Sequence, residues 1–364
     1  APYEMPEDDP AFDQEAKTTV FSWLNDYVDL ADDKTFNASL DLTWKISKFL
    51  RYNLRTGGNI NTNERKRWYG LELYQGMNNQ GYLAISNLDK SNYSVENLVM
   101  YNTKLGSWGN LDGTVGMTYE DYNFLNKNVV GTKFSVMEMR ENGMHMAGSR
   151  EYQTPIQKDY QLLSYLGRVN INLFEKYLIT ASIRADGSSK FAKGHQWGFF
   201  PSVSAGWRVS EEPFFKSIDA LKFVNQLKLR ASYGVLGDDG DLNYDWAMGY
   251  TYPATSGNMS NGDYNGYSPG YIFGGKFISA ASPMALPNEN ITWFKSKTFD
   301  VGFDFEAWNG LLGVSFDYFN RLRTGRFARR TGDLPTVVGA SAPRENLDSD
   351  RQFGIELELT HRNK

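Results

Sequence analysis

Acidic residues cluster in GDDGDLNYD, residues 237–245, and carboxylates at this density are a candidate calcium site. Asp238, Asp239 and Asp241 would supply the ligands. Their spacing differs from that of an EF-hand loop, and the terminal glutamate of such a loop is missing. A solvated turn is the competing interpretation, and it is the one that we prefer.

No arrangement of residues supports catalysis or a bound cofactor. Glu211 and Glu212 are adjacent, but neighbours on an extended chain face opposite ways, which does not suit paired acid and base work. The sequence has no cysteine and only three scattered histidines, so thiolate sites and histidine clusters for zinc are excluded. It also has no nucleophile elbow, Walker A loop or dinucleotide fingerprint. We therefore expect no enzyme, no metal and no other cofactor.

The segment 237–296 is rich in aromatic residues that alternate with glycine, asparagine and aspartate. Flat rings beside amide and carboxylate groups suit the faces and hydroxyls of sugars, or peptide backbone. Loops that pack only on themselves are also rich in tyrosine and glycine, so both interpretations stay open. The candidate contacts to a substrate or a covering partner are Tyr244, Trp246, Tyr250, Tyr264, Tyr267 and Tyr271.

The elements that must position these residues are β-strands, because apolar and polar residues alternate with a period of two. From Pro201 to Val209, for example, valine, alanine and tryptophan alternate with serine, glycine and arginine. We predict an all-β antiparallel fold of about eleven strands. The predicted strands span roughly 35–46, 49–56, 97–105, 111–120, 160–174, 177–185, 199–209, 226–236, 297–308, 311–321 and 351–361.

Short and long connections alternate along the chain. Segment 210–226 is a longer turn that has room for a helical piece. Short turns at one end and long loops at the other are the plan of outer-membrane barrels, whereas long structureless loops count against a compact soluble domain. The tight turns are 47–48, 106–110, 175–176 and 309–310, and the long joins are 57–96, 121–159, 186–198, 237–296 and 322–350.

Aromatic residues on the apolar face lie near the strand ends, as two interfacial girdles of a membrane barrel require. Large aromatics also cap the ends of a soluble core, which keeps a soluble protein as the alternative. Trp44, Tyr177 and Trp207 lie at short-turn ends, and Phe36, Tyr233, Phe299 and Phe353 lie at long-loop ends.

Charged residues occupy the opposite face, which would line the lumen of a barrel. They predict either a polarised wall that guides a polar substrate or ion pairs with neighbouring strands or a plug, and we prefer the ion pairs. The lumen-facing candidates are Arg184, Arg208, Lys228, Arg230, Asp300, Asp304 and Glu306, with Arg168, Asp317, Glu356 and Glu358 on the same face.

Composition narrows the classes of partner. The formal net charge is -5 at pH 7 and no basic face is apparent, so a nucleic-acid partner is not expected. No apolar run is long enough for a helical membrane span. Besides a membrane barrel, the sequence leaves open a soluble or surface-exposed all-β protein that binds glycans or peptides. A carbohydrate-active enzyme would need two facing carboxylates, which the sequence does not show.

Three stretches resemble one transporter family. KYLITASIRADGSSKFAKGHQWGFFPSVSAGWRVSEEPFF (176–215), LKLRASYGVLGD (227–238) and TFDVGFDFEAWNGLLGVSFDYFNRLRTG (298–325) are similar to the SusC-like branch of TonB-dependent outer-membrane transporters. The resemblance implies a barrel of about 22 strands with an N-terminal plug. It also implies location in the bacterial outer membrane, in contact with its lipid, and import of large glycans or oligopeptides.

The same resemblance implies partners. They are a SusD-like surface lipoprotein that covers the barrel and the TonB–ExbB–ExbD complex, with a dimer of transporter–lipoprotein pairs as a further assembly. The chain holds about half of the strands of such a barrel, and no plug or TonB box precedes them. We therefore expect residues 1–364 to be part of one barrel domain, with the plug and the remaining strands elsewhere.

Overall fold

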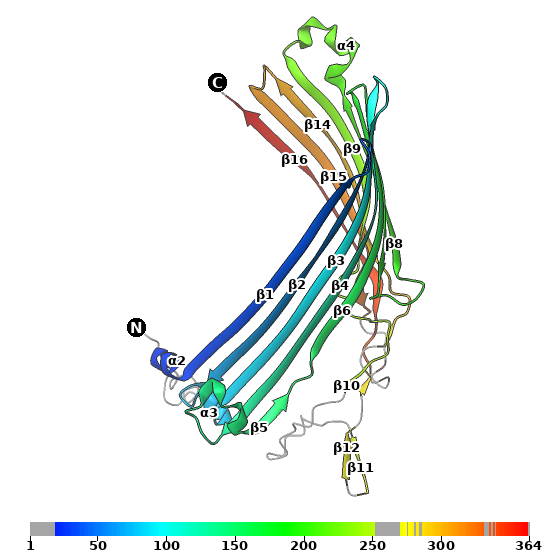
Figure 1. Ribbon diagram of the computed structural model, residues 1–364. Helices are drawn as coiled ribbons and strands as arrows, with labels where there is room; N and C mark the ends of the chain where they lie inside the picture. Colours follow the sequence, from blue (N-terminus) through cyan, green and yellow to red (C-terminus); the bar gives the residue numbers. More distant parts are fainter. Residues whose placement is uncertain are drawn as a thin grey trace. The chain divides into compact units, whose positions relative to one another are not determined.

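A computed structural model shows an antiparallel sheet that dominates the chain (Figure 1). Its strands follow the order β1-β2-β3-β4-β6-β7-β8-β9-β14-β15-β16, and β5 pairs with β4 at the side of this path. The described residues are 19–251, 270–274, 276–279, 282–283, 286–330, 335, 338 and 340–362. The strands are β1 (Tyr27–Lys45), β2 (Leu50–Tyr69), β3 (Tyr82–Lys104), β4 (Gly109–Phe134), β5 (Ala147–Tyr152), β6 (Ile156–Leu173), β7 (Tyr177–Ser188), β8 (Trp197–Arg208), β9 (Val224–Asp238), β14 (Phe294–Ala307), β15 (Leu312–Arg329) and β16 (Arg344–His361).

Short elements occupy the connections. Two small two-stranded sheets pair β10 (Tyr250–Thr251) with β13 (Ser282–Pro283) and β11 (Gly270–Phe273) with β12 (Lys276–Ser279). None of the helices among the described residues has the length and apolar character that a membrane crossing requires. The helical pieces are α2 (Val20–Asp26), α3 (Tyr74–Asn79), η1 (Arg140–Asn142), η2 (Met144–Met146), η3 (Val209–Glu211), α4 (Pro213–Lys216) and η4 (Asp219–Leu221).

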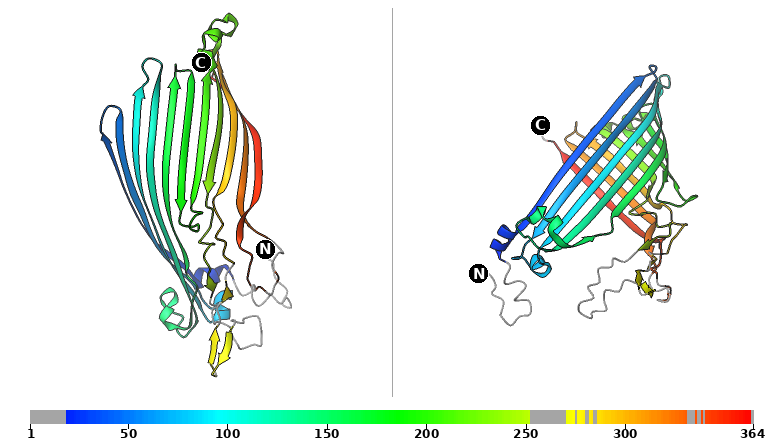
Figure 2. Two further views of the ribbon diagram at one scale, coloured as in Figure 1. Left: turned by 90° about the vertical axis from the view of Figure 1, so that its right-hand side faces the viewer. Right: turned by 60° about the horizontal axis from the view of Figure 1, so that its bottom comes forward.

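The chain divides into two compact units. The first consists of residues 1–39, 57–93 and 121–159, and the second consists of residues 40–56, 94–120 and 160–364. Within the second unit, the short connections lie together at one end of the strands (Figure 2). This arrangement confirms the predicted alternation of short and long joins, and the helical piece expected in 210–226 is present as η3, α4 and η4.

The predicted strands are present, but several are much longer than expected. Residues 57–69 continue β2, residues 82–96 open β3, and residues 121–134 continue β4. The long joins predicted at 57–96 and 121–159 are therefore wrong in extent, and so is 322–350, most of which belongs to β15 and β16. These strand extensions lack a consistently apolar face, so the alternation that marks a half-buried strand is missing from them.

The two faces of the sheet differ in polarity, as the alternation predicts. In the paired registers, Ile179 lies beside Ala205, Ala205 beside Ala231, and Ala231 beside Val301 across β7, β8, β9 and β14. On the other face, Ser182 lies beside Ser202, and their hydroxyl oxygens are 2.7 Å apart. We call these the apolar face and the polar face.

Each unit has a small buried cluster formed with its long connections. In the first unit, Trp68, Leu83, Phe134 and Ala147 are buried together. In the second unit, the cluster joins strand residues to the connections after β7, after β9 and before β14, and its members are Phe191, Phe200, Val235, Leu242, Ile291 and Trp293. The connections at this end of the second unit are therefore packed on the strands through apolar side chains.

Candidate functional site

The polar face of β9, β14 and β15 carries a network of paired charges. Arg230 Nη2 lies 2.8 Å from Asp317 Oδ2 and 3.1 Å from Asp304 Oδ1, and it donates to Ser315 Oγ at 2.8 Å. Lys228 Nζ lies 3.9 Å from Asp304 Oδ2. The predicted lumen-facing residues Lys228, Arg230 and Asp304 therefore contact one another across strands, which supports the ion-pair interpretation for this part of the face.

Arg184 forms a second pair on β7. Its Nε donates to Asp186 Oδ1 at 2.6 Å, and its Nη2 donates to Ser164 Oγ on β6 at 3.1 Å. Asp186 is buried, whereas the Arg184 side chain is 46% exposed. The pair thus combines a fixed carboxylate with a guanidinium that still reaches the surface.

Six of the predicted lumen-facing residues have no ion-pair partner within 4.0 Å among the described residues. They are Arg168, Arg208, Asp300, Glu306, Glu356 and Glu358. Asp300 lies in register with Ser232 on one side and Phe319 on the other. These six side chains keep charge on the polar face that no ion pair compensates.

A hollow of about 490 Å³ lies on the polar face of the second unit, at its long-connection end. Tyr160, Phe200 and Trp293 line it together with the Arg184–Asp186 pair. Gly237 makes room for the Phe200 ring, because a Cβ atom at Gly237 would lie 1.9 Å from Phe200 Cζ. The hollow combines aromatic surface with a charged pair, as small polar binding sites do.

The acidic turn after β9 is held by cations of the protein. Lys190 Nζ donates to Asp239 Oδ1 at 3.0 Å, and Arg344 Nη1 donates to Asp241 Oδ1 at 2.8 Å. Asp238 accepts the backbone N–H of Gly240 at 2.7 Å. The part of the chain that the structure describes contains no group of three or more His, Cys, Asp or Glu side chains able to hold a metal ion. The acidic stretch therefore forms a turn, as we preferred to a calcium site, but Asp239 and Asp241 pair with cations of the protein as well as with solvent.

Asp245 extends this clamp. It accepts from Arg344 Nε at 2.5 Å and from Arg344 Nη2 at 2.8 Å. Burial raises the pKa of the Asp245 carboxyl, but the hydrogen bonds from Arg344 and from the Asn243 N–H outweigh it and leave the pKa below its usual value. The clamp fixes the start of the connection 239–293 against the first residue of β16.

The aromatic candidates of this connection fall in different places. Tyr244 and Trp246 are half-buried, with ring centroids 6.3 Å apart, and the Tyr244 hydroxyl lies 3.0 Å from Ser189 Oγ. Tyr250 belongs to β10 and Tyr271 belongs to β11. Tyr264 and Tyr267 lie outside the described residues.

Sequence reasoning missed a ladder of amides and carboxylates between β1 and β2. Asn53 Nδ2 donates to Asp41 Oδ1 at 2.5 Å, and Asn61 Nδ2 donates to Asp33 Oδ1 at 2.6 Å. The available signal was the period of two in the asparagines of 53–63. Further rungs of the ladder are Arg55 with Asp41, Asn59 with Asn37, and Arg65 with Asp29.

A second missed feature is an aromatic cluster at the long-connection end of the first unit. The ring centroids of Tyr27 and Trp23 are 5.0 Å apart, those of Tyr27 and Tyr69 are also 5.0 Å apart, and those of Tyr69 and Tyr82 are 5.7 Å apart. Trp23 remains 45% exposed. The cluster offers aromatic surface close to the ladder of polar groups, a combination that suits sugars or peptides.

Glu212 accepts several hydrogen bonds at the short-connection end of the second unit. It accepts hydrogen bonds from the Tyr177 hydroxyl at 2.6 Å, from Trp207 Nε1 at 3.1 Å and from Lys176 Nζ at 3.2 Å. These bonds, that from Tyr177 foremost, lower the pKa of the Glu212 carboxyl. Glu211 instead pairs with Lys216 at 2.5 Å, so the two glutamates have separate partners.

The sequence matches the family described as TonB dependent receptor-like, beta-barrel, over residues 3–362. It is 34% identical over 223 residues to the TonB-dependent receptor SusC of Bacteroides thetaiotaomicron. This match covers 59% of this chain and 20% of the SusC protein. It is 26% identical to the TonB-dependent receptor P39 of Formosa agariphila, over 94% of this chain and 29% of that protein.

Solved structures agree on the fold. The RagAB peptide importer in its open-open state matches with a TM-score of 0.77 and 18% identity, over 94% of this chain and 35% of that chain. The chain thus spans about a fifth to a third of the length of these relatives.

The family explains the two faces. Its barrels lie in the bacterial outer membrane, with the apolar face of the sheet towards lipid and the polar face towards the lumen. Its members are receptors and transporters, which agrees with the lack of a catalytic arrangement in the sequence. The chain therefore belongs to the TonB-dependent receptor β-barrel family.

Proposed function

We propose that the complete protein imports large polar nutrients, glycans or oligopeptides, across the outer membrane. TonB–ExbB–ExbD would supply the energy, and a SusD-like surface lipoprotein would cover the barrel, with two such pairs forming a dimer. The observation that carries the proposal is the division of the sheet. One face is apolar across β7, β8, β9 and β14, and the other carries the Arg230 network, the Arg184–Asp186 pair and an amide ladder.

The second support is the distribution of possible contacts. Aromatic surface lies at the long-connection ends, at Trp23 and Tyr27 in the first unit and at Tyr244 and Trp246 in the second. In barrels of this kind the long connections are external, so a nutrient would meet these rings first. Tyr250, Tyr264, Tyr267 and Tyr271 extend the proposed contact set along the same connection.

Growth tests this proposal. A strain that lacks the gene should lose growth on a polymeric nutrient, either a glycan or an oligopeptide mixture, and should keep growth on the corresponding monomers. Removal of TonB should cause the same loss, and the full-length protein should co-purify with a surface lipoprotein. Unchanged growth on both polymer classes would contradict the proposal.

A further inference from the structure

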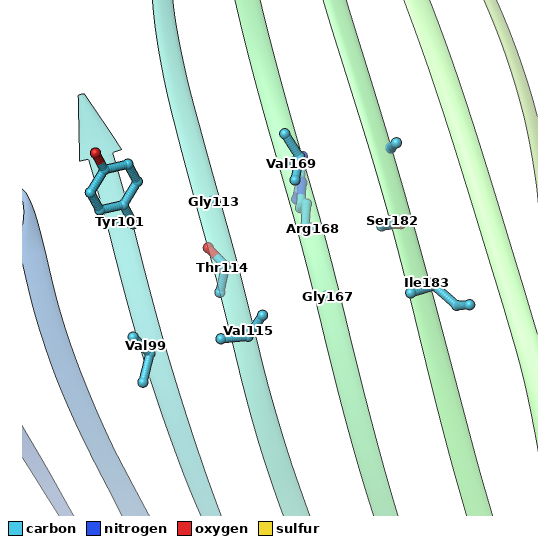
Figure 3. Close-up of a pocket in the computed structure, with 11 residues that line it drawn as sticks. Val99, Tyr101, Gly113, Thr114, Val115, Gly167, Arg168, Val169, Ser182 and Ile183 are labelled. Carbon is cyan, nitrogen blue, oxygen red and sulfur yellow. The ribbon is translucent and has the colours of Figure 1, made fainter. Parts of the chain in front are cut away.

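The apolar face of the second unit has a hollow of about 500 Å³ that spans β3, β4, β6 and β7. Gly113 and Gly167 leave its centre without side chains, as Figure 3 shows. Val99, Val115 and Ile183 stand around it, and each is at least 37% exposed. We call this depression the β4–β6 hollow.

The backbone does not require the two glycines of the hollow. Neither has a positive φ angle. A Cβ atom at Gly113 would meet nothing nearer than 4.0 Å, and one at Gly167 would meet nothing nearer than Ile183 Cγ2 at 3.8 Å. Glycine inside a strand weakens it, and it often marks a place where a ligand approaches the backbone closely. Steric room at both positions points to such an approach from outside the chain.

The position of the hollow identifies what approaches. It lies on the face that meets lipid, and Ala181 in its lining is four residues after Tyr177 at the short-connection end. At roughly 3.3 Å per residue, that is about 13 Å along the strand. Tyr177, Trp108 and Phe174, all at least 40% exposed, mark the membrane boundary at this end. The hollow therefore lies within the hydrocarbon depth of the periplasmic leaflet.

Tyr101 gives the hollow a polar end. It lines the hollow, is 42% exposed, and lies three residues before the end of β3 at the short connections. Its hydroxyl is thus nearer the boundary than Val99, which lies deeper on the same strand (Figure 3). An apolar depression with a phenol at its boundary end matches a hydrocarbon chain whose polar head lies at the interface.

We propose that the β4–β6 hollow binds an acyl chain of an outer-membrane glycerophospholipid, with the head group beside Tyr101. The proposal depends on the membrane location of the barrel and not on the transported nutrient. The bound acyl chain fills the space above Gly113 and Gly167, so that lipids which exchange freely along the rest of the apolar face are kept out of this space. The site would hold one lipid longer than the rest of the apolar face does.

Photochemical labelling tests the proposal. The full-length protein is reconstituted into nanodiscs of phosphatidylethanolamine that contain a trace of phosphatidylethanolamine with a diazirine on one acyl chain, and adducts are mapped by mass spectrometry. Peptides carrying residues 113 and 167 should be labelled several-fold more than apolar-face peptides carrying Ala205 and Ala231. Even labelling of the whole apolar face would overturn the proposal, and this comparison needs no variant.

A matched pair of variants sharpens the test. Gly113→Val with Gly167→Val fills the hollow, and Ala205→Val with Ala231→Val adds bulk to the same face outside it. Heat-modifiable migration shows that each barrel assembles. The first variant should reduce labelling at the hollow to the level of the surrounding face, and the second should leave it unchanged. Protection of these peptides in a stable dimer of the protein would make the hollow an interface between copies and would overturn the lipid assignment.

Discussion

An arginine at Phe303 gives a quantitative test of which face meets lipid. Phe303 lies on the apolar face in register with Leu229 and Phe316, and its ring stacks on that of Phe316 with centroids 5.7 Å apart. It is four residues from the end of β14 at the short connection, about 13 Å along the strand at roughly 3.3 Å per residue. With a tilt of about 40°, its depth is about 10 Å, close to the middle of an apolar band about 25 Å tall.

The expected cost follows from this depth. An arginine near the midplane of a barrel's lipid face costs about 2–4 kcal/mol. Loss of the stacked partner adds about 0.5–1.5 kcal/mol. Phe303→Arg should therefore lower the free energy of unfolding of the full-length barrel by about 2.5–5.5 kcal/mol, measured by urea titration in lipid vesicles with heat-modifiable migration as the signal.

Ser232→Arg is the matched control. Ser232 lies on the polar face in register with Asp300, whose carboxylate has no ion-pair partner among the described residues. An arginine there gains a partly solvated partner and should change stability by about 1 kcal/mol or less. Gly302 is unsuitable, because a Cβ atom there would lie 2.1 Å from Asp317 Oδ1. Equal losses from the two arginines would refute the assignment of the faces.

Three further predictions concern the strand ends. The hydrogen bonds to Glu212 lower the pKa of its carboxyl, so the stability that they contribute is complete above the ordinary pKa of 4.5 and is lost as the pH falls through the lower folded pKa. Protease cleavage within 209–223 should therefore rise as the pH falls through this range. The Glu212→Gln variant should be cleaved at the same rate above and below the range. Replacing residues 249–284 by a Gly-Ser linker keeps the parts of the connection that pack on the strands, around Leu242 and Trp293. The heat-modifiable barrel should therefore remain, while growth on the nutrient or co-purification of the lipoprotein is lost. Survival of both growth and co-purification would contradict the proposed contacts. Gly237→Ala should lower the local stability of the connection by about 1–3 kcal/mol, because its Cβ atom would clash with the Phe200 ring. Phe200→Ala in the same chain should remove this additional loss. Hydrogen exchange of the amides of 188–196 measures both effects.

The intramembrane parts of the strands were predictable because the bilayer imposes a pattern on them. In β7, β8, β9 and β14 one face meets lipid and the other does not, so residues alternate along the whole segment. The ends of β2 and β4 lack this constraint. Ile60, Thr62, Glu64 and Lys66 occupy one face of β2, and only the first is apolar. Alternation therefore detects membrane strands and fails where both faces of a strand lie outside the hydrocarbon.

The partners of charged residues could not be predicted in the same way. Alternation placed Arg230 and Asp304 on one face, but their contact depends on the register between β9 and β14, which the connection 239–293 leaves open. The packing of loops was equally hidden. Phe191 lies in a stretch rich in glycine, serine and lysine, yet it is fully buried against Ile291 and Trp293. The sequence did not predict this burial because these partners are about a hundred residues away.

Pairing on the polar face bears on how a transporter divides its work. Arg230 contacts two carboxylates, and Arg184 contacts one, so the protein itself satisfies part of the charge on the wall. Conduction requires sites weak enough for a substrate to leave, and a wall with satisfied charges meets that requirement better than one with free charges. In the proposed importer, affinity would then reside mainly at the external connections and at the proposed lipoprotein cover. The Arg344 clamp and the Phe191 cluster supply the rigid base from which such connections act.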